Sequence, residues 1–196
     1  VTVAKLLEKQ ADYFALAAMD EAVQLRQAGI SNPLLILGPV VPADYSRAAK
    51  YGISLTVSSL EEAKAISACA ESCGKKITVH VALDTGMSRI GFACTDEAAK
   101  EIAEVAKLPG IIPEGLFGHF ALADSKDKCY VNLQTENFRR MRHRIGMNFP
   151  ICHLYNSAAI VDLAPEYDMA REGIILYGLL PSDEVDLSRI GGVKPV

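Results

Sequence analysis

The stretch KITVHVALDTGMSRIGF (residues 76–92) joins a nearly continuous apolar run to a polar loop that contains two glycines. Strands that are apolar at successive positions, rather than at alternate ones, are typical of parallel sheets covered on both faces. Apolar runs of the same kind recur along the chain, at 11–18, 33–40, 53–59, 115–122, 151–158 and 173–180. We therefore expect about seven parallel strands.

The segments between these runs carry helix signals. Ser59 and Glu62 form an S-x-x-E capping box, and Gly74 can end the helix that follows. Strands that alternate with helices predict βαβ units with right-handed crossovers. Further helix signals are a possible cap at Asp20, a possible cap at Thr95, and a periodic apolar face over 132–145.

Two parallel architectures fit this alternation, a doubly wound open sheet and a (β/α)8 barrel. The chain contains neither G-x-G-x-x-G nor G-x-x-x-x-G-K-[ST], the glycine loops of common nucleotide-binding sheets. We therefore expect an α/β fold of the (β/α)8 barrel type that is incomplete by one strand. A single domain over residues 1–196 is expected, cut at both ends from a longer chain.

Composition excludes several classes of protein. The chain has 196 residues, half of them hydrophobic, and a formal net charge of -4 with mixed signs, unlike a nucleic-acid binder. No apolar run reaches the roughly 20 residues of a membrane-spanning helix, and no signal peptide is visible. An odd number of cysteines without a C-x-x-C pair predicts reduced thiols, no metal site and a cytoplasmic location. The cysteines are Cys69, Cys73, Cys94, Cys129 and Cys152.

Polar residues follow the expected strands where those strands end. Asp84 and Arg89 come at and after the end of the run that begins at residue 76, and His119 lies in the run 115–122. Ser157 lies near the end of the run 151–158, and Arg171 comes just before the run 173–180. In a parallel barrel, active-site residues lie at the carboxyl ends of the strands. We therefore expect these side chains to converge on one face of the domain.

Four motifs resemble, in order and spacing, the barrel domain of bacterial alanine racemases: DTGMSRIGF (84–92), GHFALAD (118–124), HLYNSAA (153–159) and REGIILYG (171–178). The resemblance extends over nearly the whole chain, and it implies that the missing strand of the barrel is the first one. It implies a pyridoxal-phosphate-dependent isomerase that interconverts L- and D-alanine for peptidoglycan precursors and is a homodimer as the full-length protein. Two alternatives remain, a serine racemase of the same architecture and a non-catalytic pyridoxal-phosphate-binding barrel.

The resemblance also implies roles for residues. Arg171 matches the arginine that faces the pyridine nitrogen of the cofactor, and His119 a histidine that packs beside the ring and orients Arg171. Arg89 matches the arginine that contacts the cofactor's phenolic oxygen and the substrate carboxylate. The phosphate is expected to bind the Ser157 hydroxyl and the backbone N–H groups of Gly173 and Ile174.

The role of Arg171 has a clear physical basis. A guanidinium can only donate hydrogen bonds, so a pyridine nitrogen that faces it stays unprotonated. The ring is then a weaker electron sink, which favours prompt reprotonation of the substrate over side reactions.

The chain departs from the family pattern in ways that bear on catalysis. Ala82 stands where many members have a carbamylated lysine, Ser88 where glycine is frequent, and Glu172 where proline is common. The family's cofactor-bearing lysine has no counterpart, since Lys5 lies in an expected amphipathic helix. The second base, a tyrosine from the C-terminal domain of the partner subunit, has none either. We therefore expect the 196-residue chain to be inactive by itself.

Other polar residues near the motifs are given lesser roles. Asn156 and Asp84 are expected to support their neighbours. His80 and His153 are expected to be strand residues with local hydrogen bonds.

Overall fold

The computed structural model describes residues 1–186. The residues form two compact units, each of which has its own packing. Among the described residues, the first comprises 1–82 and 100–114, and the second comprises 83–99 and 115–186. The strands β4 (Ile77–Asp84) and β6 (Ile111–Phe117) each begin in the first unit and end in the second.

The first unit is built on parallel strands. Successive strands pair in parallel, with Phe14 opposite Leu34, Leu35 opposite Ser54, and Leu55 opposite Val79. The strands are β1 (Phe14–Leu16), β2 (Leu34–Ile36), β3 (Ser54–Val57) and the first part of β4. All residues of β2 and β3 are buried, as expected for strands covered on both faces.

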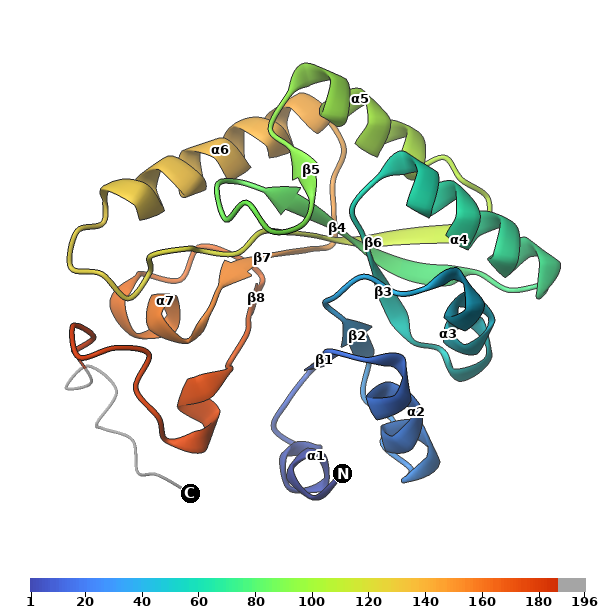
Figure 1. Cartoon of the computed structure of the whole chain (residues 1–196), viewed down its shortest axis with the longest axis horizontal. Helices are drawn as coiled ribbons and strands as arrows, with labels where there is room; N and C mark the ends of the chain where they lie inside the picture. The colour runs from blue at the N-terminus through green and yellow to red at the C-terminus, as the bar shows by residue number, and fades with distance from the viewer. Residues whose placement is uncertain (187–196) are drawn as a thin grey trace. The chain divides into compact units, whose positions relative to one another are not determined.

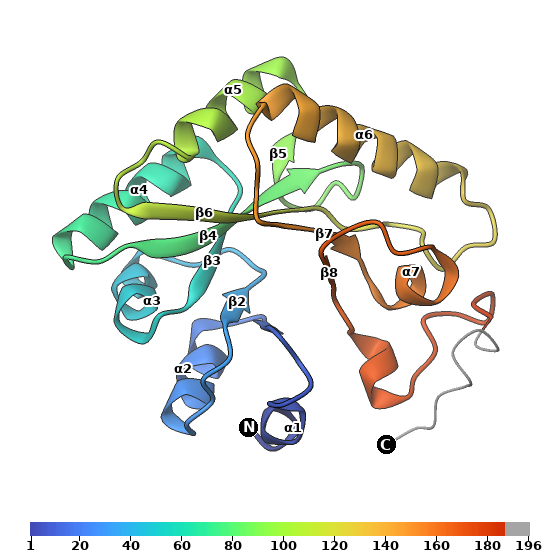
Figure 2. The ribbon, with the colours of Figure 1, turned by 180° about the vertical axis from the view of Figure 1, so that it is seen from behind.

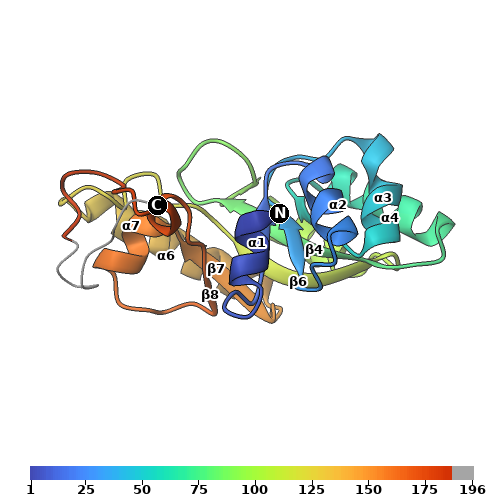
Figure 3. The ribbon, with the colours of Figure 1, turned by 90° about the horizontal axis from the view of Figure 1, so that it is seen from below.

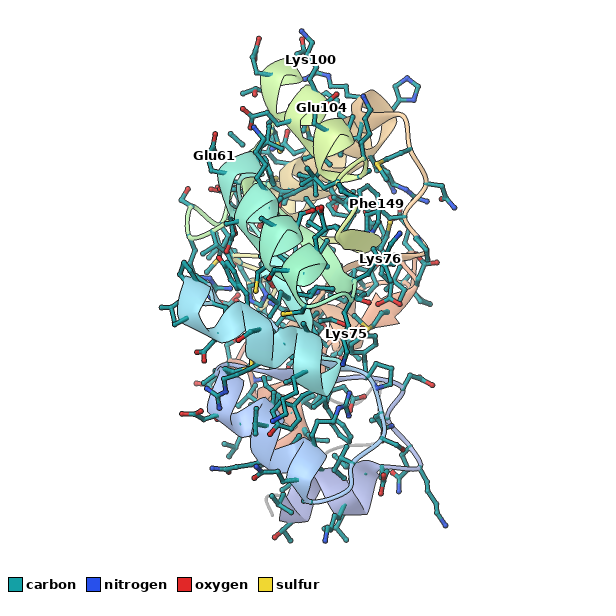
Figure 4. The ribbon with its side chains drawn as sticks, turned by 90° about the vertical axis from the view of Figure 1, so that its right-hand side faces the viewer. Glu61, Lys75, Lys76, Lys100, Glu104 and Phe149 are labelled. Atoms are coloured by element: carbon teal, nitrogen blue, oxygen red, sulfur yellow. The ribbon has the colours of Figure 1, made fainter. Side chains whose placement is uncertain are left out.

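Helices precede or connect the strands of this unit. They are α1 (Thr2–Leu7), α2 (Met19–Gln27), the 3-10 turn η1 (Pro42–Asp44), α3 (Tyr45–Tyr51), α4 (Leu60–Ser72) and α5 (Asp96–Val105), whose first turn belongs to the second unit. The helices α2, α3 and α4 lie in series along the strands (Figures 1 and 3). Charged side chains such as Glu61 on α4 and Lys100 and Glu104 on α5 point outward (Figure 4), while Ile102 and Val105 of α5 are fully buried.

The helix signals in the sequence are partly confirmed. Ser59 caps α4 by accepting a hydrogen bond from the Glu62 backbone N–H, and Thr95 caps α5 in the same way from Ala98. The expected cap at Asp20 is wrong, because α2 begins one residue earlier at Met19. There the Glu21 carboxylate accepts the N–H groups that precede the helix, at 3.0 Å each, so no cap from Asp20 is needed.

Gly110 occupies the tightest backbone contact of the first unit. Its N–H donates to Ser67 Oγ at 3.0 Å, and an added Cβ would lie 2.3 Å from the Ser67 carbonyl oxygen. That distance is far below van der Waals contact with a backbone atom of α4, which cannot move independently of its helix. Only glycine fits between α4 and the start of β6.

Gly110→Ala is therefore expected to lower the free energy of unfolding by about 2 kcal/mol, in the range typical of overpacking. Gly38→Ala is the matched control, since its Cβ would make an ordinary 3.5 Å contact with Ala17 O. Urea denaturation of both variants measures the difference. Equal stability of the two would contradict the close approach of Gly110.

The second unit continues the parallel pairing. Its pairs are Leu83 with Phe92, Phe117 with His153, and His153 with Met169. Its elements are the end of β4, β5 (Phe92–Ala93), the end of β6, α6 (Cys129–Ile145), β7 (Ile151–Tyr155), α7 (Ser157–Asp162), β8 (Met169–Ala170) and the 3-10 turn η2 (Ile174–Tyr177). Figures 1 and 2 show β7 leading into α7 and the chain returning through β8 to η2.

The expected strand at 173–180 is wrong. This segment forms η2, and the strand that pairs with β7 is β8, which precedes Arg171. The N–H groups of Gly173 and Ile175 donate to Ser157 Oγ, and Leu176 N–H donates to Gly173 O, so these groups are not available to a strand ladder. Arg171 thus follows a strand, as the other site residues do.

Strand order and parallel pairing confirm the expected fold class. The hydrogen-bonded order is β1-β2-β3-β4-β6-β7-β8, with β5 paired to β4, and every pairing whose register is given is parallel. Consecutive parallel strands joined by crossover helices, in this order, are the arrangement of an incomplete (β/α)8 barrel.

Candidate active site at the strand ends of the second unit

The loop after β4 carries Arg89. Asp84 Oδ1 accepts hydrogen bonds from the backbone N–H groups of Gly86 (3.0 Å) and Ser88 (2.9 Å), so a single carboxylate closes the turn. Ser88 adopts a positive φ of 57°, a conformation in which glycine is more comfortable. Arg89 follows directly, and its side chain is exposed. Asp84 is thus a support, as expected.

His119 follows β6 and is half-buried. Burial, together with the positive charges of Arg171 and Arg89, lowers the pKa of His119 to about 4. The imidazole is therefore neutral near pH 7. It can pack against or hydrogen-bond a ligand there, but it is a weak base.

Arg171 follows β8, and its guanidinium is held from several sides. It donates to Gly118 O at 2.7 Å and to His153 Nδ1, and it lies 3.4 Å from His119 Nδ1. Its carbon lies 5.5 Å from the centroid of the Phe117 ring. Burial and the charge of Arg89 lower the pKa of Arg171 to about 10, so it stays protonated at neutral pH.

His153 is a strand residue with a local hydrogen bond, as expected, but its contact with Arg171 makes it a candidate site residue that the sequence did not reveal. Because a guanidinium only donates, His153 Nδ1 must be the acceptor, which places the proton of the neutral ring on Nε2. The His153 ring also stacks on Phe117, with centroids 4.8 Å apart and planes 7° apart. His153 therefore helps to hold the Arg171 guanidinium in place. The available signal was strand register: His153 pairs with Met169, two residues before Arg171.

Ser157 begins α7 and joins it to the segment after Arg171. Its Oγ accepts hydrogen bonds from the N–H groups of Gly173 (3.0 Å) and Ile175 (3.4 Å). Ile174, whose N–H was expected to bind phosphate, has a side chain that is 43% exposed. Asn156 caps α7 through the Ala159 N–H and donates to Phe120 O, so it is a structural support, as expected.

The remaining expectations concern residues around these motifs. Ala82 is buried on β4, and Glu172 is exposed. His80 is buried and lies 3.1 Å from Glu114, which gives it the local contact expected of a strand residue.

All five cysteines are free. Within residues 1–186, no helix is long and apolar enough to cross a membrane. Over the same described range, no group of three or more His, Cys, Asp or Glu residues could hold a metal ion.

The depressed pKa of His119 predicts a pH dependence of stability. The folded pKa of about 4 lies below the ordinary value of 6.5, so as pH falls from 6.5 the unfolded chain takes up a proton that the folded chain refuses. The free energy of unfolding is therefore unaffected by protonation of His119 above pH 6.5. It falls as the pH drops from 6.5 toward 4, by up to ~1.4 kcal/mol per pH unit. Urea denaturation at several pH values, compared with His119→Gln, measures it. Parallel curves for the two proteins would contradict the assignment.

The protein is thus a parallel α/β domain with a cationic site at the strand ends of the second unit. The site combines two arginines and a neutral histidine with a hydroxyl and backbone N–H groups. This donor set suits a ligand that carries several anionic oxygens.

The comparisons with known proteins define the family. Residues 1–181 match the family model described as alanine racemase, N-terminal domain, and the chain belongs to this family. It is 43% identical to the alanine racemase of Desulforamulus reducens over 195 residues, which cover 97% of this chain and 53% of that protein. The chain therefore spans about half the length of the curated relatives it matches.

Solved structures agree. The alanine racemase of Clostridium difficile 630 matches all of this chain and 52% of its own with a TM-score of 0.95 at 44% identity. The histidine racemase of Leuconostoc mesenteroides matches 94% of this chain and 50% of its own with a TM-score of 0.83 at 28% identity.

Proposed function

We propose that this chain is the pyridoxal-phosphate-binding barrel domain of an amino-acid racemase, and that the whole protein interconverts L- and D-alanine for cell-wall precursors. The observation that carries the proposal is the fixed guanidinium of Arg171. It is held by Gly118 O and His153 and lies beside a neutral His119. A donor fixed in this way suits a ring nitrogen that must stay unprotonated.

The residues present fit the cofactor. Ser157 Oγ already accepts two N–H groups, so its own proton remains to donate to a phosphate oxygen. The backbone at Gly173 passes close to this hydroxyl, since an added Cβ would lie in contact with Ser157 Oγ at 3.4 Å. Arg89 and Arg171 supply positive charge for a ligand with anionic phosphate and phenolic groups.

The bound cofactor would supply an electron-withdrawing ring that stabilises negative charge at the substrate's α-carbon. Arg171 would hold the ring nitrogen unprotonated and thereby limit that withdrawal. Arg89, exposed at the end of its loop, would bind the substrate carboxylate. His119 would pack beside the ring as a neutral group.

Racemisation removes a proton from one face of the α-carbon and returns it to the other, so two bases are required. Arginines cannot accept protons, and His119, with a pKa of about 4, is too weak a base. We therefore assign both bases to the whole protein: the lysine that carries the cofactor and a tyrosine of a second subunit, which makes the working enzyme a homodimer.

The substrate is argued from the relatives, which are alanine racemases, whereas a histidine racemase shares the fold at 28% identity. The test is to incubate the whole protein with pyridoxal phosphate and L-alanine, L-serine or L-histidine and to measure the D-enantiomer. We expect D-alanine to form fastest, and the 196-residue chain alone to form it no faster than free cofactor does. Faster turnover of serine or histidine would show that alanine is not the preferred substrate. Cofactor binding without any turnover would favour a non-catalytic pyridoxal-phosphate-binding barrel.

A further inference from the structure

One face of α6 contacts both loops that carry site residues in the second unit. Tyr130, Gln134 and Asn137 are spaced i, i+4 and i+7, which places them on the same side of the helix. The Tyr130 hydroxyl donates to Gly86 O at 2.7 Å, and Asn137 Nδ2 donates to Thr85 O at 3.0 Å. Two side chains thus bind consecutive carbonyl groups of the loop that leads to Arg89.

Gln134 connects that loop to the segment carrying His119. Its amide is fully buried, and Oε1 accepts from Ala121 N–H at 2.9 Å. Nε2 donates to His119 O at 2.9 Å and to Thr85 Oγ1 at 3.1 Å. A single side chain therefore satisfies buried polar groups on both segments, and an apolar substitute would leave those groups without partners.

Gly86 adds an independent observation. Its φ is +138°, and an added Cβ would lie 2.9 Å from the Tyr130 hydroxyl oxygen and 3.4 Å from Gln134 Cγ. The positive φ and the nearby Tyr130 hydroxyl together favour glycine where the loop meets α6. Packing of α6 does not require the buried amide of Gln134, because the buried apolar residues Phe138 and Met141 already attach this helix to the core.

We propose that Tyr130, Gln134 and Asn137, the α6 clamp, are positioning residues of the cofactor site. They fix the loop that carries Arg89 and the segment that carries His119 relative to each other. The inference rests on the proposed function for its ligand, but the geometry it concerns exists without the ligand. Arg89 and His119 interact electrostatically, since the charge of Arg89 contributes to the low pKa of His119.

The test compares Gln134→Met with Phe138→Leu. Methionine keeps the length of glutamine but makes none of its hydrogen bonds. Phe138 is equally buried on the same helix, packs against Tyr167 with ring centroids 5.3 Å apart, and has no polar group that could bind the loop carbonyls. Each variant is measured for thermal stability, for the pKa of His119 by NMR without ligand, and for affinity toward pyridoxamine 5′-phosphate. This probe has the cofactor's ring and phosphate but no aldehyde to react with lysines.

Both variants are expected to lose stability, but only Gln134→Met should change the site. Its His119 pKa should rise, and its affinity for the probe should fall about tenfold, the equivalent of ~1.4 kcal/mol. Tyr130→Phe, which removes one hydroxyl, should shift both quantities in the same direction by less, and it serves if Gln134→Met does not fold.

Two results separate the clamp from the proposed function. An unchanged His119 pKa and unchanged affinity in folded Gln134→Met, or in folded Tyr130→Phe if the former does not fold, would overturn the clamp, even if the wild-type chain binds the probe. A raised His119 pKa in a clamp variant, combined with no binding of the probe to the wild-type chain, would support the clamp and overturn the proposed ligand.

Discussion

Arg171→Met is expected to weaken binding of pyridoxamine 5′-phosphate by about 100-fold. The variant would lose the proposed charge-assisted hydrogen bond to the ring nitrogen, and such bonds contribute about 1.5–3 kcal/mol. It also loses one of the two positive charges that lie near His119. Isothermal titration calorimetry on the wild-type chain and the variant measures the affinity ratio.

The same variant should raise the pKa of His119. Burial is the largest cause of the low value and would remain, but the charge of Arg171, the second cause, would be gone. Arg171→Lys is the matched control, because it keeps a positive charge but not the planar guanidinium that reaches His153 and Gly118 O together. We expect the lysine variant to bind weakly while His119 keeps a low pKa. Wild-type affinity in Arg171→Met would refute the role of Arg171.

Ser157→Ala should weaken the binding of pyridoxamine 5′-phosphate by about 30-fold, equivalent to ~2 kcal/mol of binding free energy. The hydroxyl is expected to donate to the phosphate, and it also fixes the Gly173 and Ile175 N–H groups. Pyridoxamine, which has no phosphate, should bind the variant and the wild-type chain equally. The ratio of the two affinities therefore reports the phosphate contact alone.

The control is Ser182→Ala, which removes a hydroxyl from the same unit, where it donates to Asp124 O at 3.1 Å. It should leave both affinities unchanged. An equal loss for pyridoxamine and its phosphate in Ser157→Ala would mean that Ser157 acts on the fold instead of on the phosphate.

Much of the fold could be predicted because buried parallel strands are apolar at almost every position. The runs at 53–59 and 76–84 became β3 and β4 nearly as expected. The expected position of the candidate site residues at strand ends is also seen, since Arg89, His119, Ser157 and Arg171 all follow strands. The run 115–122 was placed too late, because β6 begins at Ile111 and ends at Phe117.

The segment 173–180 could not be predicted from apolarity. Its residues are as hydrophobic as a strand, but Ser157, sixteen residues earlier, takes the N–H group of Gly173. Gly178 then ends the turn in the left-handed region, with φ 71°. Hydrogen bonds to a distant side chain leave no trace in local periodicity.

His153 and Gln134 were missed for a related reason. Each acts through partners brought close by strand register or by helix packing: His153 through Arg171, and Gln134 through Thr85, His119 and Ala121. A histidine in a strand and a glutamine in a helix are both ordinary by themselves. Only the fold reveals that one holds the guanidinium and the other joins two loops.

The most direct test of the account is NMR mapping of pyridoxamine 5′-phosphate on the 196-residue chain. We expect saturable, one-to-one binding, with the largest amide shifts at 173–175 and at His119, and a ³¹P shift that Ser157→Ala abolishes. Binding that shifts residues of the first unit instead, or a ³¹P signal that is unchanged at saturation, would contradict the assignment of the cofactor site to the strand ends of the second unit.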